Sequence, residues 1–91
     1  MRHARPSDLD RIDGFLSQLR ALGMLKEKSR GTFYRGSRAF LHFHEHEGEL
    51  FADARLGEDF ERCRANTVAE RDRLLSRVQK VLSAGKASPD R

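Results

Sequence analysis

Three histidines, His42, His44 and His46, follow one another at two-residue spacing in the segment FLHFHEH. If this segment is a β-strand, their side chains point to the same side of a sheet, about 6 to 7 Å from one to the next. Two neighbouring imidazoles could then bind a zinc ion, with Asp53 as a further ligand or as the partner that orients one ring. Three ligands on one flat strand spread too far to reach the same ion, so a full site needs a group from another strand or loop. We therefore expect no tightly bound metal and no cofactor.

Aromatic and basic residues are interleaved with these histidines. The candidate ligand-binding surface of the predicted sheet consists of Phe33, Arg35, Arg38, Phe40, His42, His44, Phe51, Asp53 and Arg55. Rings that stack on bases, next to guanidinium groups that bind phosphates, are typical of surfaces that bind single-stranded nucleic acid or another anion. A second copy of the chain could equally cover the rings in a homodimer.

A purely structural role is the alternative for the same residues. Charged and aromatic cross-strand pairs stabilise a sheet without binding any ligand. His42 could simply pair with Asp53, and Phe60 in the following loop could cover the phenylalanines. The sequence leaves this interpretation open beside the metal, anion and self-association hypotheses.

The segments on either side of this region carry apolar residues at the three-to-four-residue spacing of amphipathic helices. The first helix is predicted over about residues 8–22, with Gly23 as the left-handed residue that ends it. The second begins with a capping box formed by Thr67 and Glu70, and Gly85 is expected to end it.

Between the helices, alternating apolar and polar residues predict an antiparallel meander. Its three strands are expected near residues 31–35, 38–46 and 49–56, and a short strand at 24–28 would be a fourth. The predicted fold class is α+β, in the order α-β-β-β-α, with both helices on one face of the sheet.

Two-residue turns at 36–37 and 47–48 set the predicted register. With these turns, Phe33 lies opposite Phe40 and His42 lies opposite Asp53. One face is then apolar and packs under the helices; it holds Thr32, Tyr34, Ala39, Leu41, Phe43, Leu50, Ala52, Ala54 and Leu56. The candidate ligand-binding surface lies on the other face, together with His46, and stays open.

Length and composition limit the class of protein. Residues 1–91 are expected to form a single domain, with flexible tails at 1–6 and 86–91. No segment is apolar enough for a membrane span or a signal peptide, and Cys63 is the sole cysteine, so we expect a cytoplasmic protein without disulfides. The 18 basic and 14 acidic residues give a formal net charge of +4, which permits an anionic partner without requiring one.

The segment Tyr34–Leu75, from YRGSRAFLHFHEHEGELFADARL to the start of the second helix, resembles a small bacterial α+β family of uncharacterised proteins. The resemblance implies a helix, antiparallel strands and a second helix, and it brings no catalytic or binding residues. The residues themselves favour a non-enzymatic binding or interaction module that uses the open face of the sheet.

Overall fold

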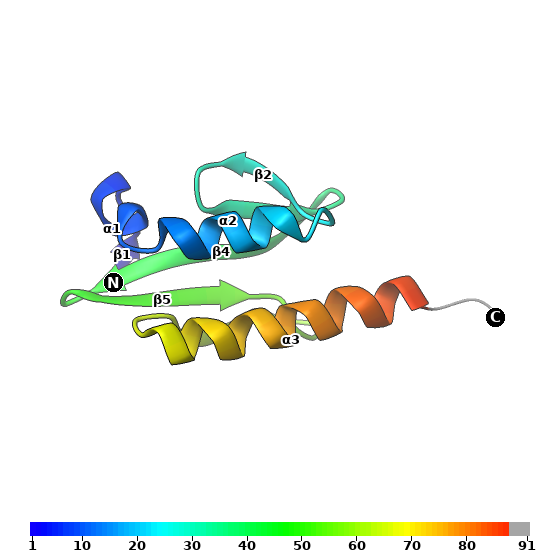
Figure 1. The fold of residues 1–91 in the computed structure, drawn as a ribbon. Helices are drawn as coiled ribbons and strands as arrows, with labels where there is room; N and C mark the ends of the chain where they lie inside the picture. Colours follow the sequence, from blue (N-terminus) through cyan, green and yellow to red (C-terminus); the bar gives the residue numbers. More distant parts are fainter. Residues whose placement is uncertain (88–91) are drawn as a thin grey trace.

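The computed structural model of the chain describes residues 1–87 and has an α+β architecture. Helices α2 (Asp13–Ala21) and α3 (Val68–Ala87) cover one side of an antiparallel sheet (Figure 1). The strands are β1 (Arg2–His3), β2 (Lys26–Ser29), β3 (Thr32–Arg35), β4 (Arg38–His46), β5 (Glu49–Ala54) and β6 (Glu61–Arg64). Their order is β2-β3-β4-β5-β6, and β1 also pairs with β4. The predicted fold class is confirmed, with a larger sheet than the central meander.

The predicted first helix is divided in two. The short α1 (Pro6–Asp10) begins where a carboxylate oxygen of Asp8 accepts a hydrogen bond from the backbone N–H of Arg5 at 2.9 Å. The chain leaves helical geometry at Ile12, where φ is −121° and ψ is 26°, and α2 starts at the next residue. Ile12 is buried, so the break turns an apolar side chain into the core. Gly23 has a φ of +73° and ends α2 as predicted.

The capping box of α3 is confirmed, because Thr67 Oγ1 accepts from the Glu70 N–H at 3.1 Å and a Glu70 carboxylate oxygen accepts from the Thr67 N–H at 3.0 Å. The predicted end at Gly85 is wrong, since α3 continues to Ala87. A glycine in a helix costs only about 1 kcal/mol relative to alanine, which the helix tolerates. Of the predicted tail 86–91, the first two residues belong to α3 and 88–91 lie outside the described residues. None of the helices among residues 1–87 combines the length and the apolar character that a membrane crossing needs.

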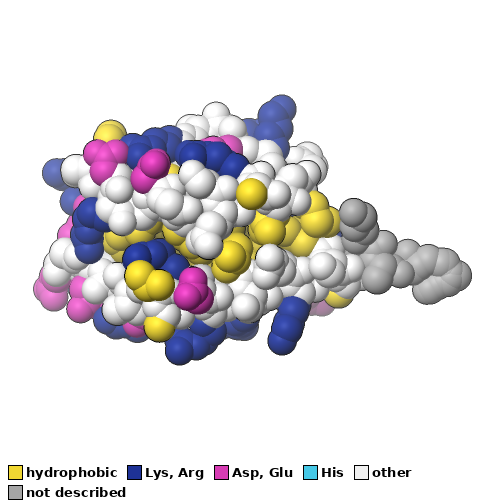
Figure 2. All heavy atoms as spheres, viewed as in Figure 1, with side chains coloured by type: hydrophobic (Ala, Val, Ile, Leu, Met, Phe, Trp, Pro, Cys, Tyr) yellow, Lys and Arg dark blue, Asp and Glu magenta, His cyan; other side chains and the backbone are white. Residues whose placement is uncertain are grey.

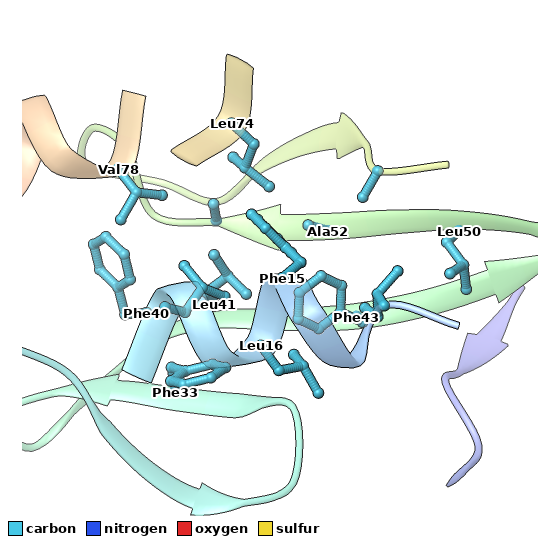
Figure 3. Close-up of a cluster of buried hydrophobic side chains, with 14 of the residues drawn as sticks. Phe15, Leu16, Phe33, Phe40, Leu41, Phe43, Leu50, Ala52, Leu74 and Val78 are labelled. Atoms are coloured by element: carbon cyan, nitrogen blue, oxygen red, sulfur yellow. The ribbon is translucent and has the colours of Figure 1, made fainter. Parts of the chain in front are cut away.

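The hydrophobic core lies between the sheet and the two long helices. It contains Leu9, Ile12, Phe15, Leu16, Leu19, Phe33, Phe40, Leu41, Phe43, Leu50, Ala52, Ala54, Ala65, Leu74, Val78 and Leu82, part of which Figure 3 shows. Apolar side chains also reach the surface along the seam between α2 and α3, and no histidine is visible on this side (Figure 2). The histidines are therefore separated from the helices by the sheet.

The hairpin of β4 and β5 has the predicted register. His42 pairs with Asp53 and Phe43 with Ala52 across these strands. Glu47 and Gly48 form the turn with φ values of +52° and +83°, the left-handed conformations that a tight two-residue hairpin turn requires.

The hairpin of β3 and β4 departs from the predicted register because of a β-bulge. Arg35 pairs with Arg38 as expected, but Phe33 pairs with Leu41, which leaves Phe40 as an extra residue on β4. Directly paired side chains point to the same side of a sheet, so Phe33 joins Leu41 in the core. Phe40 is rotated inward by the bulge, and both rings are buried, with exposed fractions of 0% and 2%. Their predicted position on the open face is wrong.

The bulge also moves Tyr34 and Ala39, which pair with each other and were expected on the core face. Both are half-buried rather than core residues, and the ammonium group of Lys28 lies 4.2 Å from the centre of the Tyr34 ring. One extra residue thus reverses the alternation of the strands toward the 36–37 turn.

Two strands at the sheet margins were not expected. β1 lies in the predicted flexible tail 1–6, where Arg2 pairs with Glu45 and His3 with His44. β6 lies in the predicted loop after β5 and pairs antiparallel with it. These two strands bring additional polar side chains to the open side of the sheet.

Candidate metal centre

Three histidines from two strands meet on the open side of the sheet. His42 and His44 lie two residues apart on β4, and His3 of β1 lies directly opposite His44. Paired residues share a side of the sheet, so His3 points to the side of His42 and His44. The third imidazole, which one flat strand cannot supply, comes from a second strand.

The rings of His3, His42 and His44 form one group, called here the histidine cluster. The ring centres are 4.8 Å apart for His3 and His44, 4.9 Å for His42 and His44, and 5.9 Å for His3 and His42. Each ring offers one nitrogen, and these three nitrogens all lie within 4.8 Å of one another. A point central to three such atoms is at most about 2.8 Å from each, and zinc binds imidazole nitrogens at about 2.0 to 2.1 Å. Shifts of less than about 1 Å per ring would close the difference.

Part of the histidine cluster is buried without hydrogen bonds. Among the described residues, neither Nδ1 of His42 nor Nε2 of His44 has a hydrogen-bond partner, and both atoms are shielded from solvent. Nε2 of His44 lies 3.1 Å from Oδ2 of Asp53, but the two groups are not aligned for a hydrogen bond. A buried polar atom without a partner costs about 1 to 3 kcal/mol. Nδ1 of His42 is therefore available to a ligand, whereas Nε2 of His44 faces the carboxylate of Asp53.

Burial lowers the pKa of His42 below its ordinary value, and the neighbouring His44 lowers it further. The carboxylate of Asp53 opposes this shift without cancelling it. His42 is therefore neutral at neutral pH, and a neutral imidazole is the form that coordinates a metal ion.

A carboxylate fixed by an arginine stands behind the histidine cluster. Asp53 on β5 pairs with His42 on one side and with Arg62 of β6 on the other. Nε and Nη2 of Arg62 donate to the two carboxylate oxygens of Asp53, each at 2.8 Å. This bidentate bond holds the pKa of the Asp53 carboxyl below its ordinary value. Asp53 is thus a fixed anion beside His44, as is common behind metal-bound histidines.

Phe60 covers one flank of the histidine cluster. Its ring packs edge-on against His42, with 5.2 Å between ring centres, and the guanidinium carbon of Arg55 lies 4.3 Å from its centre. Phe60 itself is exposed at the surface. Phe60 was expected to cover the phenylalanines of the open face, but it packs against His42 instead.

The candidate ligand-binding surface predicted from the sequence is divided by the structure. His42, His44, Phe51 and Asp53 remain together on the open side, and Arg55 lies at its margin. Phe33 and Phe40 are core residues. Arg35 and Arg38 line a separate pocket that includes Val81 of α3. The interleaved aromatic and basic surface is thus not a single surface.

Two residues of the site were missed by the sequence analysis. His3 was assigned to a tail, and its strand of two residues is too short for periodicity to reveal. Arg62 was assigned to a loop, although the segment ERCR alternates and could be read as a strand. His46, in contrast, was predicted on the same face as His42 and His44 but is not part of the site. Its side chain is 48% exposed and lies outside the histidine cluster.

Cys63 does not belong to the site. It pairs with the core residue Ala52 and therefore lies on the helix side of β6. Burial and the nearby Glu61 raise the pKa of the thiol above its ordinary value. The flanking arginines do not activate it as a nucleophile, because a raised pKa disfavours the thiolate.

Comparison of the chain with models of known protein families, with curated proteins and with solved structures gives no match. The resemblance of Tyr34–Leu75 to an uncharacterised bacterial family stays a prediction.

Proposed function

We propose that this protein is a small binding module whose open sheet face binds a divalent transition-metal ion of the zinc class through His3, His42 and His44. The observation that carries the proposal is the convergence of three imidazoles from two strands, each of which offers one nitrogen within 4.8 Å of the other two. A metal ion between the rings would bind one nitrogen of each imidazole.

The type of donor favours zinc or a neighbouring transition metal. Imidazole suits zinc, copper, nickel and iron, whereas calcium and magnesium prefer oxygen donors. Three protein ligands leave a fourth tetrahedral position for water or an external ligand. His3 is exposed, so this position would be reached from the solvent side of the cluster.

Charge balance also supports the proposal. Asp53 brings a negative charge to His44, and Arg62 neutralises that charge while holding the carboxylate in place. The bidentate pair of Arg62 and Asp53 therefore places a carboxylate beside the histidine cluster without leaving either charge unpaired. Asp53 would orient one coordinated ring, as second partners of metal-bound histidines do.

Binding of single-stranded nucleic acid on the same face has less support. Base stacking needs exposed rings, and Phe33 and Phe40 are buried. Phe51 remains on this face, but the guanidinium carbon of Arg64 lies 5.5 Å from its ring centre. Arg64 and Arg62 are also engaged with carboxylates, which leaves fewer charges for a phosphate backbone.

The test is a metal titration of the chelator-treated protein without a histidine tag. We expect one zinc ion per chain and a rise in melting temperature, because a ligand at about 100 times its Kd adds about 2.7 kcal/mol of stability. Cobalt should give the visible absorption of a tetrahedral complex with nitrogen donors.

His46→Ala is the matched control, because it removes an imidazole from the same strand and the same face but outside the histidine cluster. Zinc uptake should be lost in His42→Ala and His3→Ala and kept in His46→Ala. Absence of saturable uptake in the unmodified protein, or equal losses in His46→Ala and His42→Ala, would overturn the proposal.

A further inference from the structure

We infer that the pocket lined by Arg35, Arg38 and Arg55 is a binding site for a phosphate group. The remaining lining residues are Ala39, Phe40, Gly57 and Val81, and the cavity measures about 130 Å³. It lies between the turn of β3 and β4, the chain after β5, and α3. This site is separate from the histidine cluster and does not depend on it.

The first observation is the position of Arg35 and Arg38. They pair directly opposite each other across the 36–37 turn, and like charges in such a position destabilise a sheet. Among residues 1–87, no carboxylate pairs with either guanidinium. Elsewhere in the same part of the chain, the arginines that form ion pairs are Arg2, Arg20, Arg30, Arg62, Arg64 and Arg77. Two adjacent positive charges that have no counterion in the described part of the chain are therefore concentrated at this pocket.

Arg55 supplies a third guanidinium that the protein holds in place. Nε of Arg55 donates to the carbonyl oxygen of Ala39 at 3.1 Å, and Nη1 donates to that of Glu58 at 2.8 Å. The side chain also lies over the ring of Phe60. With Nε and Nη1 so engaged, Nη2 has no partner among the described residues. Arg55 is thus oriented before any ligand arrives, which reduces the entropy lost on binding.

The β-bulge explains why these groups meet. The extra residue, Phe40, reverses the side that Arg35 and Arg38 occupy and brings them to the side of Val81. Phe40 and Val81 then form an apolar wall beside the guanidinium groups. Charge-assisted hydrogen bonds are stronger next to such a wall than in water, because the local dielectric constant is lower.

The size and the charge of the pocket define the ligand. Pockets for drug-sized molecules measure about 300 to 1,000 Å³, so this cavity accommodates a terminal group and not a whole nucleotide. Among residues 1–87, no acidic side chain lines it. Guanidinium groups bind phosphate oxygens through paired N–H donors, so a phosphate, either free or at the end of a larger molecule, fits the site.

The test uses the metal-free protein in a buffer without phosphate, and titration calorimetry with three probes: inorganic phosphate, adenosine monophosphate and adenosine. We expect phosphate and adenosine monophosphate to bind with similar affinity and adenosine not to bind, because the pocket holds the phosphate alone. A much tighter monophosphate would show that the source is a nucleotide or another ester rather than the free ion.

Arg38→Ala should weaken binding by about 10- to 100-fold, the effect of losing a charge-assisted hydrogen bond. Arg73→Ala is the matched control, since Arg73 is exposed on α3, outside the pocket, and its removal changes the net charge by the same amount. Arg35→Ala gives a second variant, and neither pocket variant removes an internal hydrogen bond among the described residues, so both should remain folded. Equal effects of Arg38→Ala and Arg73→Ala, or no saturable phosphate binding at low salt, would overturn the inference.

Discussion

The two ends of β4 carry similar patterns in the sequence and different structures. At the β5 turn end, His42 and His44 keep strict alternation and stay on the open side of the sheet. At the other end, the bulge at Phe40 turns the alternation over and moves Phe33 and Phe40 into the core. Both ends carry a proposed binding site, for a metal cation among the imidazoles at one end and for a phosphate among the guanidinium groups at the other. The side that a strand residue faces therefore depends on every residue between it and the turn.

The largest effect that tests this comparison is the loss of a core ring. Phe33→Ala and Phe40→Ala should each lower the free energy of unfolding by about 3 to 5 kcal/mol, because both rings are fully buried. Leu41→Ala and Phe43→Ala should cost about 2 to 5 kcal/mol for the same reason. Chemical denaturation of each purified variant gives these values.

Phe51→Ala is the control for the core substitutions. Phe51 lies on the open face, half-buried, so its removal should cost distinctly less than that of Phe40. Equal costs for Phe40→Ala and Phe51→Ala would mean that no bulge is present and that simple alternation holds along the whole of β4.

The sequence predicts the regular parts of the fold well. The hairpin of β4 and β5 follows from alternation and from a Glu-Gly turn whose φ values are both positive. The cap of α3 follows from Thr67 and Glu70, whose short-range hydrogen bonds involve only neighbouring residues. Such features are local, so the chemistry of a few residues is enough to predict them.

The features that the sequence misses depend on contacts between distant segments. At the bulge, Phe40 lies beside Val81 of the distant helix α3, and alternation alone cannot place an extra residue. β1 is two residues long and is held in position by Arg2, which pairs with Asp8 and Glu45. Two of the three histidines were predicted on one face, but the third could not be, because its position depends on this long-range pairing.

A smaller change in stability tests how firmly β1 is held beside the end of β4 that carries His44. Hydrogen bonding to the Arg5 N–H, together with the charge of Arg2, lowers the pKa of the Asp8 carboxyl below its ordinary value. A carboxyl with a depressed pKa in the folded state adds stability above its unfolded pKa and loses it as the pH falls through the folded value. Asp8→Asn should therefore cost about 1 kcal/mol near neutral pH, comparable to the loss of a helix cap.

Denaturation of the two proteins from about pH 6 down to about pH 2 checks this effect, with the unfolded pKa near the reference value for aspartate. The difference between wild type and Asp8→Asn should shrink below about pH 4 and disappear when Asp8 is protonated in both states. A difference that stays constant over the whole range would show that the ionised carboxylate of Asp8 contributes nothing to stability.

The smallest expected change in unfolding free energy has opposite signs for an arginine near each end of β4. Arg38→Ala removes one of two like charges that face each other across the turn, so the unfolding free energy should stay constant or rise by up to about 0.5 kcal/mol. Arg2→Ala makes the same change in net charge but breaks ion pairs with Asp8 and Glu45, and it should cost about 0.5 to 1 kcal/mol. Added salt should shrink both differences, because it screens repulsion and attraction alike. Thermal denaturation at low and high salt, in a buffer without phosphate, measures both. A loss of stability in Arg38→Ala equal to that in Arg2→Ala would show that the guanidinium at the turn already has a partner, and it would remove the reason for an anion to bind there.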